Sequence, residues 1–213
     1  MSKQSVCIIG AGAAGLCALR HFACDSLHFE PVVCYEQADC LGGTWNYVEQ
    51  TELVTESFVH SSMYRDLKTN LPMQIMEFPD FPATRNTAGE SYLHHSQVLQ
   101  YLHDYADHFA LRPFISFSHQ LLKVARNQTD NVWEVTVNQQ LPKPISFTRH
   151  FDILLLCPGR YSRPKWPADL IETLSNFTGS VVHSHSYRSR EAYAGQRVAV
   201  IGGGPSGLDI SLE

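Results

Sequence analysis

Six residues near the start of the chain have the types and spacing of a phosphate-binding turn. A short apolar run leads into G-x-G-x-x-G, and small apolar residues follow it directly. Glycines at these positions permit a tight turn, close approach of the backbone to a pyrophosphate, and close packing of a helix on a strand. The free N–H groups at the start of that helix would face the phosphates. The motif consists of Gly10, Ala11, Gly12, Ala13, Ala14 and Gly15.

An acidic residue follows this motif at the distance that a nucleotide site requires. Glu36 closes a second apolar run, about twenty residues after the glycines. A carboxylate there accepts hydrogen bonds from ribose hydroxyls. A tight turn without a ligand would not require Glu36. The motif, its flanking runs and this carboxylate together predict a dinucleotide-binding site.

The apolar runs around the motif predict the elements that position it. We expect strands at Ser5–Ile9 and Pro31–Glu36, joined by a helix at Ala13–Ala23. Two parallel strands with a helical crossover form the first unit of a Rossmann-like fold. The predicted fold class is therefore α/β with a parallel sheet.

A glycine pair, Gly42-Gly43, follows Glu36 and precedes Thr44 and Trp45. Glycines beside a pyrophosphate let the chain approach it, and a tryptophan can cover an aromatic ring. A Gly-Gly turn next to a core tryptophan explains the same residues without a ligand. On the residues alone, both interpretations stay open.

An irregular stretch and one long helix are expected next. Residues 37–82 are rich in glycine, proline and aromatic residues, and loops of this length in a compact domain are usually functional. Ser96 is the expected N-cap of a helix that runs to about Phe109. Its apolar stripe comprises Val98, Leu99, Leu102, Tyr105, Ala106 and Phe109.

The second half of the chain contains further strand patterns. Leu121–Ala125 and Val132–Val137 alternate and predict a β-meander beside the parallel sheet. Phe151–Cys157 predicts a central buried strand. Shorter strands are expected at Val181–His183 and Arg197–Ile201.

A second glycine loop follows the last of these strands and opens a helix that reaches Glu213 after about two turns. A lone strand and half a helix cannot bury their apolar faces, so we expect the natural protein to continue beyond this point. The apolar residues that we expect to be exposed are Val198, Val200, Leu208 and Leu212.

These motifs together resemble the flavin-containing monooxygenases, over the whole chain and in the family's order. The run from Glu36 to Trp45 is similar to a segment of that family in which an acidic residue is followed by G-G-x-W. Residues 177–187 match F-x-G-x-x-x-H-x-x-x-Y, the identifying sequence of N-hydroxylating and flavin-containing monooxygenases. Tyr187 favours the flavin-containing branch, because Baeyer–Villiger relatives usually carry tryptophan there. Thr69-Asn70-Leu71-Pro72 resembles the T-N-x-P segment, whose asparagine lies beside the flavin.

The second glycine loop is similar to the family's NADPH-binding G-x-G-x-S-G. The resemblance implies a Rossmann-like FAD-binding domain at residues 1–175. It implies that residues 176–213 are a linker with the signature, followed by the truncated start of an NADPH-binding Rossmann domain. It assigns FAD contacts to Gly42, Gly43, Thr44, Trp45, Thr69, Asn70 and Leu71, and NADPH contacts to Gly202, Gly204, Ser206, Gly207 and Asp209.

The implied activity is NADPH-driven N- or S-oxygenation of a small amine or sulfide by O2, through a C4a-hydroperoxyflavin. The cofactors carry this chemistry, and Asn70 is the expected catalytic residue, positioning the hydroperoxide or the nicotinamide. The alternative is a catalytically inactive FAD-binding fragment or truncated product. A flavin disulfide reductase shares both glycine loops but needs paired cysteines, and none of the six cysteines forms a C-x-x-C pair.

Two details of the resemblance carry separate expectations. Cys157-Pro158-Gly159 stands where the family usually has Ala-Thr-Gly, so we expect the turn to be kept but no backbone N–H at Pro158. His183 belongs to the signature, and we favour an architectural hydrogen-bonding role for it over a role as a base.

Composition excludes several other classes of function. The formal charge is −5 with scattered lysines and arginines, which argues against nucleic acid as a partner. No apolar run reaches the length of a membrane span, and no secretory signal precedes the first strand. No histidine lies at a metal-ligand spacing, so no metal is expected. We expect a cytoplasmic protein with reduced thiols. An oligomer, and membrane association through residues beyond Glu213, both stay open.

Overall fold

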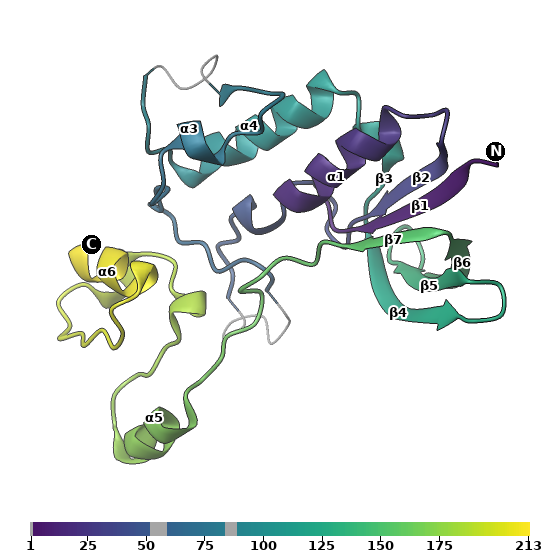
Figure 1. The fold of residues 1–213 in the computed structure, drawn as a ribbon. Coiled ribbons are helices and arrows are strands. Elements are labelled where there is room, and N and C mark those ends of the chain that lie inside the picture. The colour runs from purple at the N-terminus through teal and green to yellow at the C-terminus, as the bar shows by residue number, and fades with distance from the viewer. Residues whose placement is uncertain (1, 52–58, 84–88) are drawn as a thin grey trace.

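A parallel sheet and an antiparallel sheet organise the first three quarters of the chain (Figure 1). This computed structural model describes residues 2–51, 59–83 and 89–213. The parallel sheet has the order β3-β2-β1-β7, formed by β1 (Gln4–Ile9), β2 (Phe29–Tyr35), β3 (Ile115–Ser116) and β7 (Ile153–Leu156). The antiparallel sheet has the order β4-β5-β6, formed by β4 (His119–Asn127), β5 (Val132–Gln139) and β6 (Ile145–Phe151).

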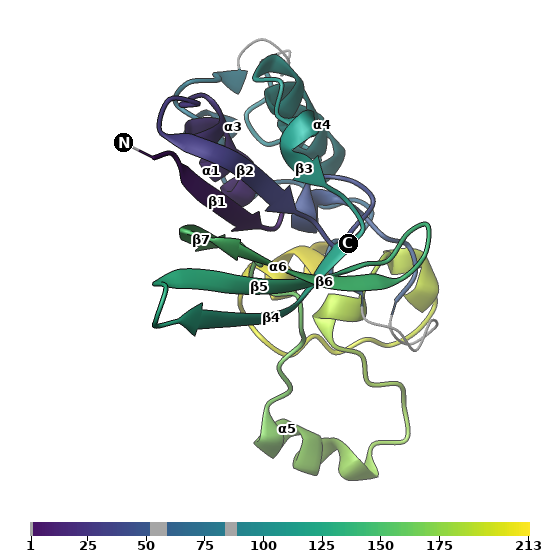
Figure 2. The ribbon, with the colours of Figure 1, turned by 90° about the vertical axis from the view of Figure 1, so that its right-hand side faces the viewer.

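Alternation along β1 shows why the fold has layers. Val6 and Ile8 belong to a core cluster with helices α1 (Ala13–Ala23) and α4 (His95–His108), whereas Cys7 and Ile9 pack with residues of β5 and β6. Successive side chains of a strand point to opposite faces, so a strand that is apolar throughout is covered on both. Figures 1 and 2 show the two helices on one face of the parallel sheet and the meander on the other. The predicted α/β fold with a meander is confirmed.

Short elements fill the connection between β2 and α4. They are the 3-10 helix η1 (Gly43–Trp45) and the single helical turn α3 (Met73–Met76); a further 3-10 helix, η3 (Arg112–Phe114), follows α4. This stretch is irregular, as predicted, although residues 52–58 of it lie outside the described part. Extended backbone is held here by individual hydrogen bonds rather than by a ladder, for example from Thr69 N–H to Leu93 O at 2.8 Å.

The helix α4 begins two residues earlier than its sequence suggests. Ser96 is not the N-cap; His94 is, and its ring accepts the N–H of Ser96 at 3.3 Å. The Gln97 side chain accepts the N–H of His94 at 2.9 Å and completes a reciprocal cap. Histidine is not among the Ser, Thr, Asp and Asn residues that usually cap a helix, so the sequence pattern favours Ser96.

The predicted strand Phe151–Cys157 is also wrong in two respects. Phe151 ends β6, which is the third strand of the meander and was missed, and β7 begins at Ile153. β7 pairs with β1 from Val6↔Ile153 to Ile9↔Leu156 and is the last strand of its sheet within the described residues, so it is half-buried rather than central. A run of apolar residues could not reveal the turn at Asp152, whose carboxylate accepts the Ser5 N–H at 2.7 Å.

The C-terminal quarter contains short helices. They are α5 (Ala168–Thr173), η4 (Leu174–Asn176), η5 (Ser184–Ser186), η6 (Arg190–Tyr193) and α6 (Pro205–Leu212). The strands predicted at 181–183 and 197–201 do not form, because no described segment pairs with them. The expected exposure is confirmed: Val198 and Leu208 are each 57% exposed, and Leu212 is 86% exposed.

Candidate nucleotide-binding site

The first glycine turn has the geometry that the motif requires. Gly10 has φ +100°, and a Cβ there would lie 2.4 Å from the Cys157 carbonyl oxygen. A Cβ on Gly15 would lie 1.7 Å from the Gly10 carbonyl oxygen, so the helix packs directly on the turn. Gly12 is the N-cap of α1, with no side-chain cap and no acidic residue in the first turn. The N-terminus of α1 is therefore open to an anion.

The Gly-Gly turn lies against the first glycine motif. Gly42 donates its N–H to Ala11 O at 3.0 Å. A Cβ on Gly43 would lie 3.0 Å from Gly12 Cα, and Gly43 has φ +57°. Two glycines thus face one another at the helix N-terminus, and side chains on them would fill the space between the two turns.

Glu36 lies just beyond β2 and is buried. One carboxylate oxygen accepts the Ala11 N–H at 2.7 Å, and the other accepts the Ala38 N–H at 2.9 Å. The carboxylate therefore ties the glycine motif to the chain that leads into the Gly-Gly turn. This structural role was not foreseen from the sequence, which predicted only a ribose contact.

Trp45 and Thr44 differ in their environment. Trp45 is half-buried and packs against the main core cluster, while Thr44 is exposed. The Thr44 carbonyl accepts the Ser61 hydroxyl at 2.9 Å, and the His60 ring contacts the Gly43 carbonyl at 3.2 Å. This packing agrees with the interpretation of a Gly-Gly turn next to a core tryptophan. The facing glycines Gly12 and Gly43 are a separate observation that this interpretation does not explain.

Thr69 presents Asn70 at the surface. Thr69 is buried, and its hydroxyl accepts the Leu93 N–H at 3.0 Å. Asn70 is exposed, and its side chain makes no hydrogen bond with any described residue. Leu71 is 49% exposed. The contacts of Thr69 therefore fix the backbone next to Asn70, whose side chain is exposed.

The second glycine turn repeats the first one locally. Gly202 has φ +119°, and a Cβ on Gly207 would lie 2.0 Å from the Gly202 carbonyl oxygen. Gly204 is the N-cap of α6, with φ −78° and ψ 175°, close to the −77° and −173° of Gly12. The turn forms although no strand precedes it. Ser206 is exposed at the start of the helix.

Asp209 joins this second unit to the rest of the chain. Its carboxylate accepts the Tyr64 hydroxyl at 2.8 Å, across 145 positions of sequence. The Tyr64 ring packs edge-on against Tyr187, which donates its hydroxyl to Glu213. Burial and the bond to Asp209 raise the pKa of Tyr64 above its ordinary value, so it is a neutral donor. Sequence patterns offered no signal for this contact.

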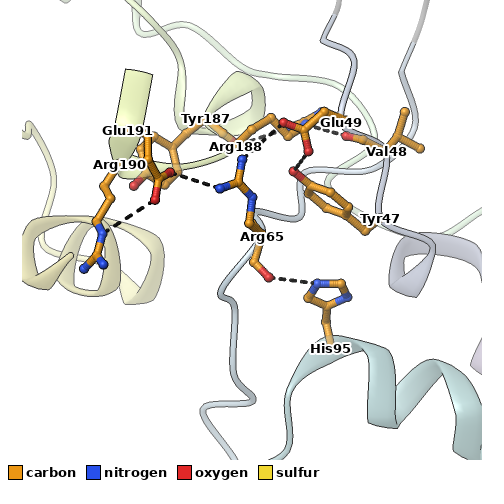
Figure 3. Close-up of polar contacts among 9 residues, drawn as sticks. All are labelled: Tyr47, Val48, Glu49, Arg65, His95, Tyr187, Arg188, Arg190 and Glu191. Carbon is orange, nitrogen blue, oxygen red and sulfur yellow. Dashed lines mark hydrogen bonds and ion pairs between the residues drawn. The ribbon is translucent and has the colours of Figure 1, made fainter. Parts of the chain in front are cut away.

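Arg65 and Arg188 lie where residues 47–65 meet the signature segment, a place called the junction below (Figure 3). The sequence predicted no role for either arginine. Arg188 is buried, and Arg65 reaches Glu49 at 3.4 Å and Glu191 at 3.2 Å. The carbonyl of Arg65 accepts hydrogen bonds from the rings of His94 and His95. Arg188 directly follows the signature tyrosine, Tyr187, and this position is the sequence signal that could have indicated a role for it.

The cysteines around the first turn are thiols rather than thiolates. All six are free. Burial raises the pKa of Cys7 to about 12, and burial together with Asp39 and Glu36 raises the pKa of Cys40 to about 11. A thiolate is the reactive form, so these residues do not provide a dithiol redox centre at neutral pH.

The two remaining motif details have structural explanations. Gly159 has φ +77°, so the turn after Pro158 is kept, as expected. The His183 ring accepts the His185 N–H at 3.0 Å, caps η5, and packs edge-on against Trp166. Across the described ranges, no three histidine, cysteine or carboxylate side chains gather to hold a metal ion.

Comparison with known proteins shows the family of this chain. The flavin-binding monooxygenase-like family matches residues 3–213. The chain belongs to this family. Flavin-containing monooxygenase FMO GS-OX-like 4 of Arabidopsis thaliana is 35% identical over 99% of the chain and 48% of its own length. Flavin-containing monooxygenase 5 of Rattus norvegicus is 32% identical over 100% of the chain and 38% of its own length.

Solved structures show the same fold in this family. S-allyl-L-cysteine S-oxygenase from Allium sativum superposes with a TM-score of 0.83 and 29% identity, over 99% of this chain and 48% of its own. Tmm from Pelagibacter sp. strain HTCC7211 gives 0.85 and 28%, over 98% and 48%. The chain thus spans about half the length of these relatives or less. Among the described helices, none has the length and apolar character needed to cross a bilayer.

Proposed function

We propose that this chain forms the FAD site and the start of the NADPH site of a flavin-dependent monooxygenase. Its substrates would be O2 and a small amine or sulfide with an oxidisable nitrogen or sulfur. The observation that carries the proposal is the pair of facing turns, Gly12 opposite Gly43, at the open N-terminus of α1. Family membership supports it, and so do relatives named as an S-oxygenase and as a putative N-oxide-forming dimethylaniline monooxygenase.

The residues present fit the adenosine diphosphate half of FAD. Backbone without side chains on both sides of a helix N-terminus lets a pyrophosphate approach the N–H groups. Each oxygen of the Glu36 carboxylate accepts one backbone N–H and keeps capacity for a ribose hydroxyl. We assign Gly10 to Gly15, Glu36, and Gly42 to Trp45 to this half. FAD, when bound, supplies the chemistry, by taking a hydride from NADPH and activating O2.

The chain's own residues bind, orient and exclude water around this chemistry. Asn70 is the proposed catalytic residue, because its amide is exposed and unpaired among the described residues while Thr69 holds the backbone beneath it. The second glycine turn would receive the NADPH pyrophosphate, at Gly202, Gly204, Ser206 and Gly207. Asp209 would support that turn through its bond to Tyr64. We propose residues 1–175 as the FAD-binding part and residues 176–213 as the linker and the start of the NADPH-binding part.

A specific observation favours the second candidate, a flavin-binding chain without oxygenase activity. Residues 197–201 form no strand, so the second glycine turn has no sheet beneath it. A Rossmann-type site takes its ribose contact from the strand that follows. Under this candidate, residues 1–213 would bind FAD but would not catalyse its reduction by NADPH.

Titration of residues 1–213 with FAD, followed by flavin fluorescence, tests the nucleotide site. We expect saturable binding that ADP competes away, because ADP carries the half that the glycine turns hold. The matched control is Gly12→Val, whose side chain enters the space facing Gly43. A yellow, flavin-loaded Gly12→Val protein, or binding that ADP does not affect, would refute the assignment.

Asn70 is tested in a form of the protein that oxidises NADPH. Asn70→Ala should still bind FAD and accept reduction, because the residue is exposed and supports no described contact. Oxygenated product per NADPH should fall about tenfold or more, with a matching rise in hydrogen peroxide. Ile75→Ala, at an exposed position outside the assigned cofactor contacts, is the control. Unchanged product yield in Asn70→Ala would show that the residue is structural.

A further inference from the structure

Arg188 is a buried cation bound largely by backbone. Only 7% of the residue is exposed. A guanidinium at this depth is tolerated because charge-assisted hydrogen bonds replace its water. It donates to five carbonyl oxygens: Val48 at 2.6 Å, His185 at 2.8 Å, Tyr187 at 2.9 Å, Ser61 at 3.1 Å and Gln50 at 3.3 Å.

These acceptors come from three segments that carry different parts of the site. Residues 48–50 follow the Gly-Gly turn and Trp45. Ser61 begins the stretch that leads to Thr69 and Asn70. His185 and Tyr187 belong to the signature that precedes the second glycine turn. A planar fork with five N–H groups binds several carbonyls at fixed angles, whereas an ammonium group does not.

Neighbouring contacts extend the junction in both directions. Toward the first turn, Ser61 donates to Thr44 O at 2.9 Å. Toward the second, the N–H of Arg65 donates to Arg188 O at 2.8 Å, and Tyr64 donates to Asp209 on α6 at 2.8 Å. Together with the chain itself between Tyr64 and Arg65, this series of hydrogen bonds connects the segment after the Gly-Gly turn to α6, the helix of the second turn.

The exposed ion pairs around the junction are secondary to this series. Figure 3 shows Arg65 between Glu49 and Glu191, with Arg190 also reaching Glu191. All four of these side chains are about half exposed or more. Exposed pairs contribute little, because water screens them. The buried guanidinium therefore holds the segments together.

We propose that Arg188 is a positioning residue that sets the second glycine turn relative to the first. It does so by holding the signature segment against residues 48–50 and Ser61. The contacts stand on the structure alone, whereas their consequence, the placement of the nicotinamide half relative to the flavin half, rests on the proposed function. Arg188 touches neither nucleotide in this proposal and acts through the segments that it joins.

Hydrogen exchange of residues 1–213 without any nucleotide tests the proposal directly. In Arg188→Lys we expect amides of residues 59–66, including the Arg65 N–H, and of residues 205–213 to exchange about tenfold faster. Peptides from β1 and α1 should be unchanged. Arg190→Lys, an exposed arginine on the same segment, is the control and should match the wild type.

A second variant separates positioning from a general contribution to stability. Tyr64→Phe removes the bond to Asp209 and keeps the ring, so it should speed exchange in residues 205–213. If Arg188 acts through this series, Tyr64→Phe has a much smaller effect in the Arg188→Lys background than in the wild type. Should Arg188→Lys not fold, Ser61→Ala takes its place, since it cuts the series at Thr44 while leaving the guanidinium in position.

Two results would overturn the proposal. The first is exchange that rises equally throughout the chain, β1 included, in Arg188→Lys. The second is additivity of Tyr64→Phe with either partner variant. The FAD titration described above is run on the same proteins. If the wild type does not bind FAD, the proposed function is refuted while the exchange result still stands. Failure of the proposed function and failure of the Arg188 proposal are therefore distinguishable.

Discussion

Two glycines of the first motif should respond differently to a single added methyl group. Gly12 has φ −77°, which any residue adopts, and a Cβ there would lie 3.6 Å from Gly43 Cα, an ordinary contact. A Cβ on Gly15 would lie 1.7 Å from a backbone oxygen, where nothing flexible can give way. Gly12→Ala should therefore fold without strain, whereas Gly15→Ala should be strongly destabilised.

The sizes of the two effects follow from these distances. Alanine at a compatible glycine position stabilises by about 0.4–1 kcal/mol through the unfolded chain, but alanine at an N-cap costs a similar amount relative to glycine, so the two effects roughly cancel at Gly12. A methyl group forced against backbone costs about 1–3 kcal/mol or more, and at 1.7 Å we expect the upper end at least. For nucleotide binding, the Gly12 methyl group would displace the pyrophosphate from an N–H. Loss of one such charge-assisted bond, about 1.5–3 kcal/mol, weakens binding about 10- to 100-fold.

Two measurements on residues 1–213 separate these effects. Urea denaturation gives the stability of each variant, and FAD titration by flavin fluorescence gives its affinity. Gly12→Ala should be as stable as the wild type and bind weakly, while Gly15→Ala should be destabilised. Gly203→Ala is the control, because Gly203 lies outside the first motif, is not in a left-handed conformation, and a Cβ there meets nothing within 4 Å. Gly12→Ala with wild-type affinity would refute close approach of the pyrophosphate at this position.

Three further predictions concern other parts of the chain. Glu36→Ala leaves two backbone N–H groups without their acceptor and should lower the free energy of unfolding by about 2 kcal/mol in urea, whereas exposed Glu172→Ala should not; equal values would contradict the structural role. Burial, with His94 adding to it, lowers the pKa of His95 below its ordinary 6.5, so the unfolded chain gains a proton first as pH falls. Stability should thus be full above about pH 6.5 and decline below it, less steeply in His95→Gln than in the wild type; identical slopes in thermal melts would exclude His95. Residues 1–213 with FAD should consume NADPH no faster than free FAD in the presence of a thioether or tertiary amine, and turnover above that level would show that another chain or a second copy completes the site.

Local features of this protein are determined by its sequence. Gly10 and Gly202 both occur in left-handed conformations that favour glycine, and a glycine, Gly12 or Gly204, is the N-cap of the helix that follows each turn. The second turn takes this shape without a supporting sheet, because its geometry depends on neighbours within six positions. The uninterrupted apolar run of β1 likewise predicts burial on both faces. Short-range sterics and periodicity carry these results.

Long-range features were decided by the tertiary structure alone. The run 197–201 has the composition of a strand but remains unpaired, because a strand requires a partner that no described segment supplies. Arg188 and Tyr64 are ordinary residues in sequence, and only folding places them beside residues up to 145 positions away. Hydrogen bonds between such distant groups depend on the path of the whole backbone, which no local pattern encodes.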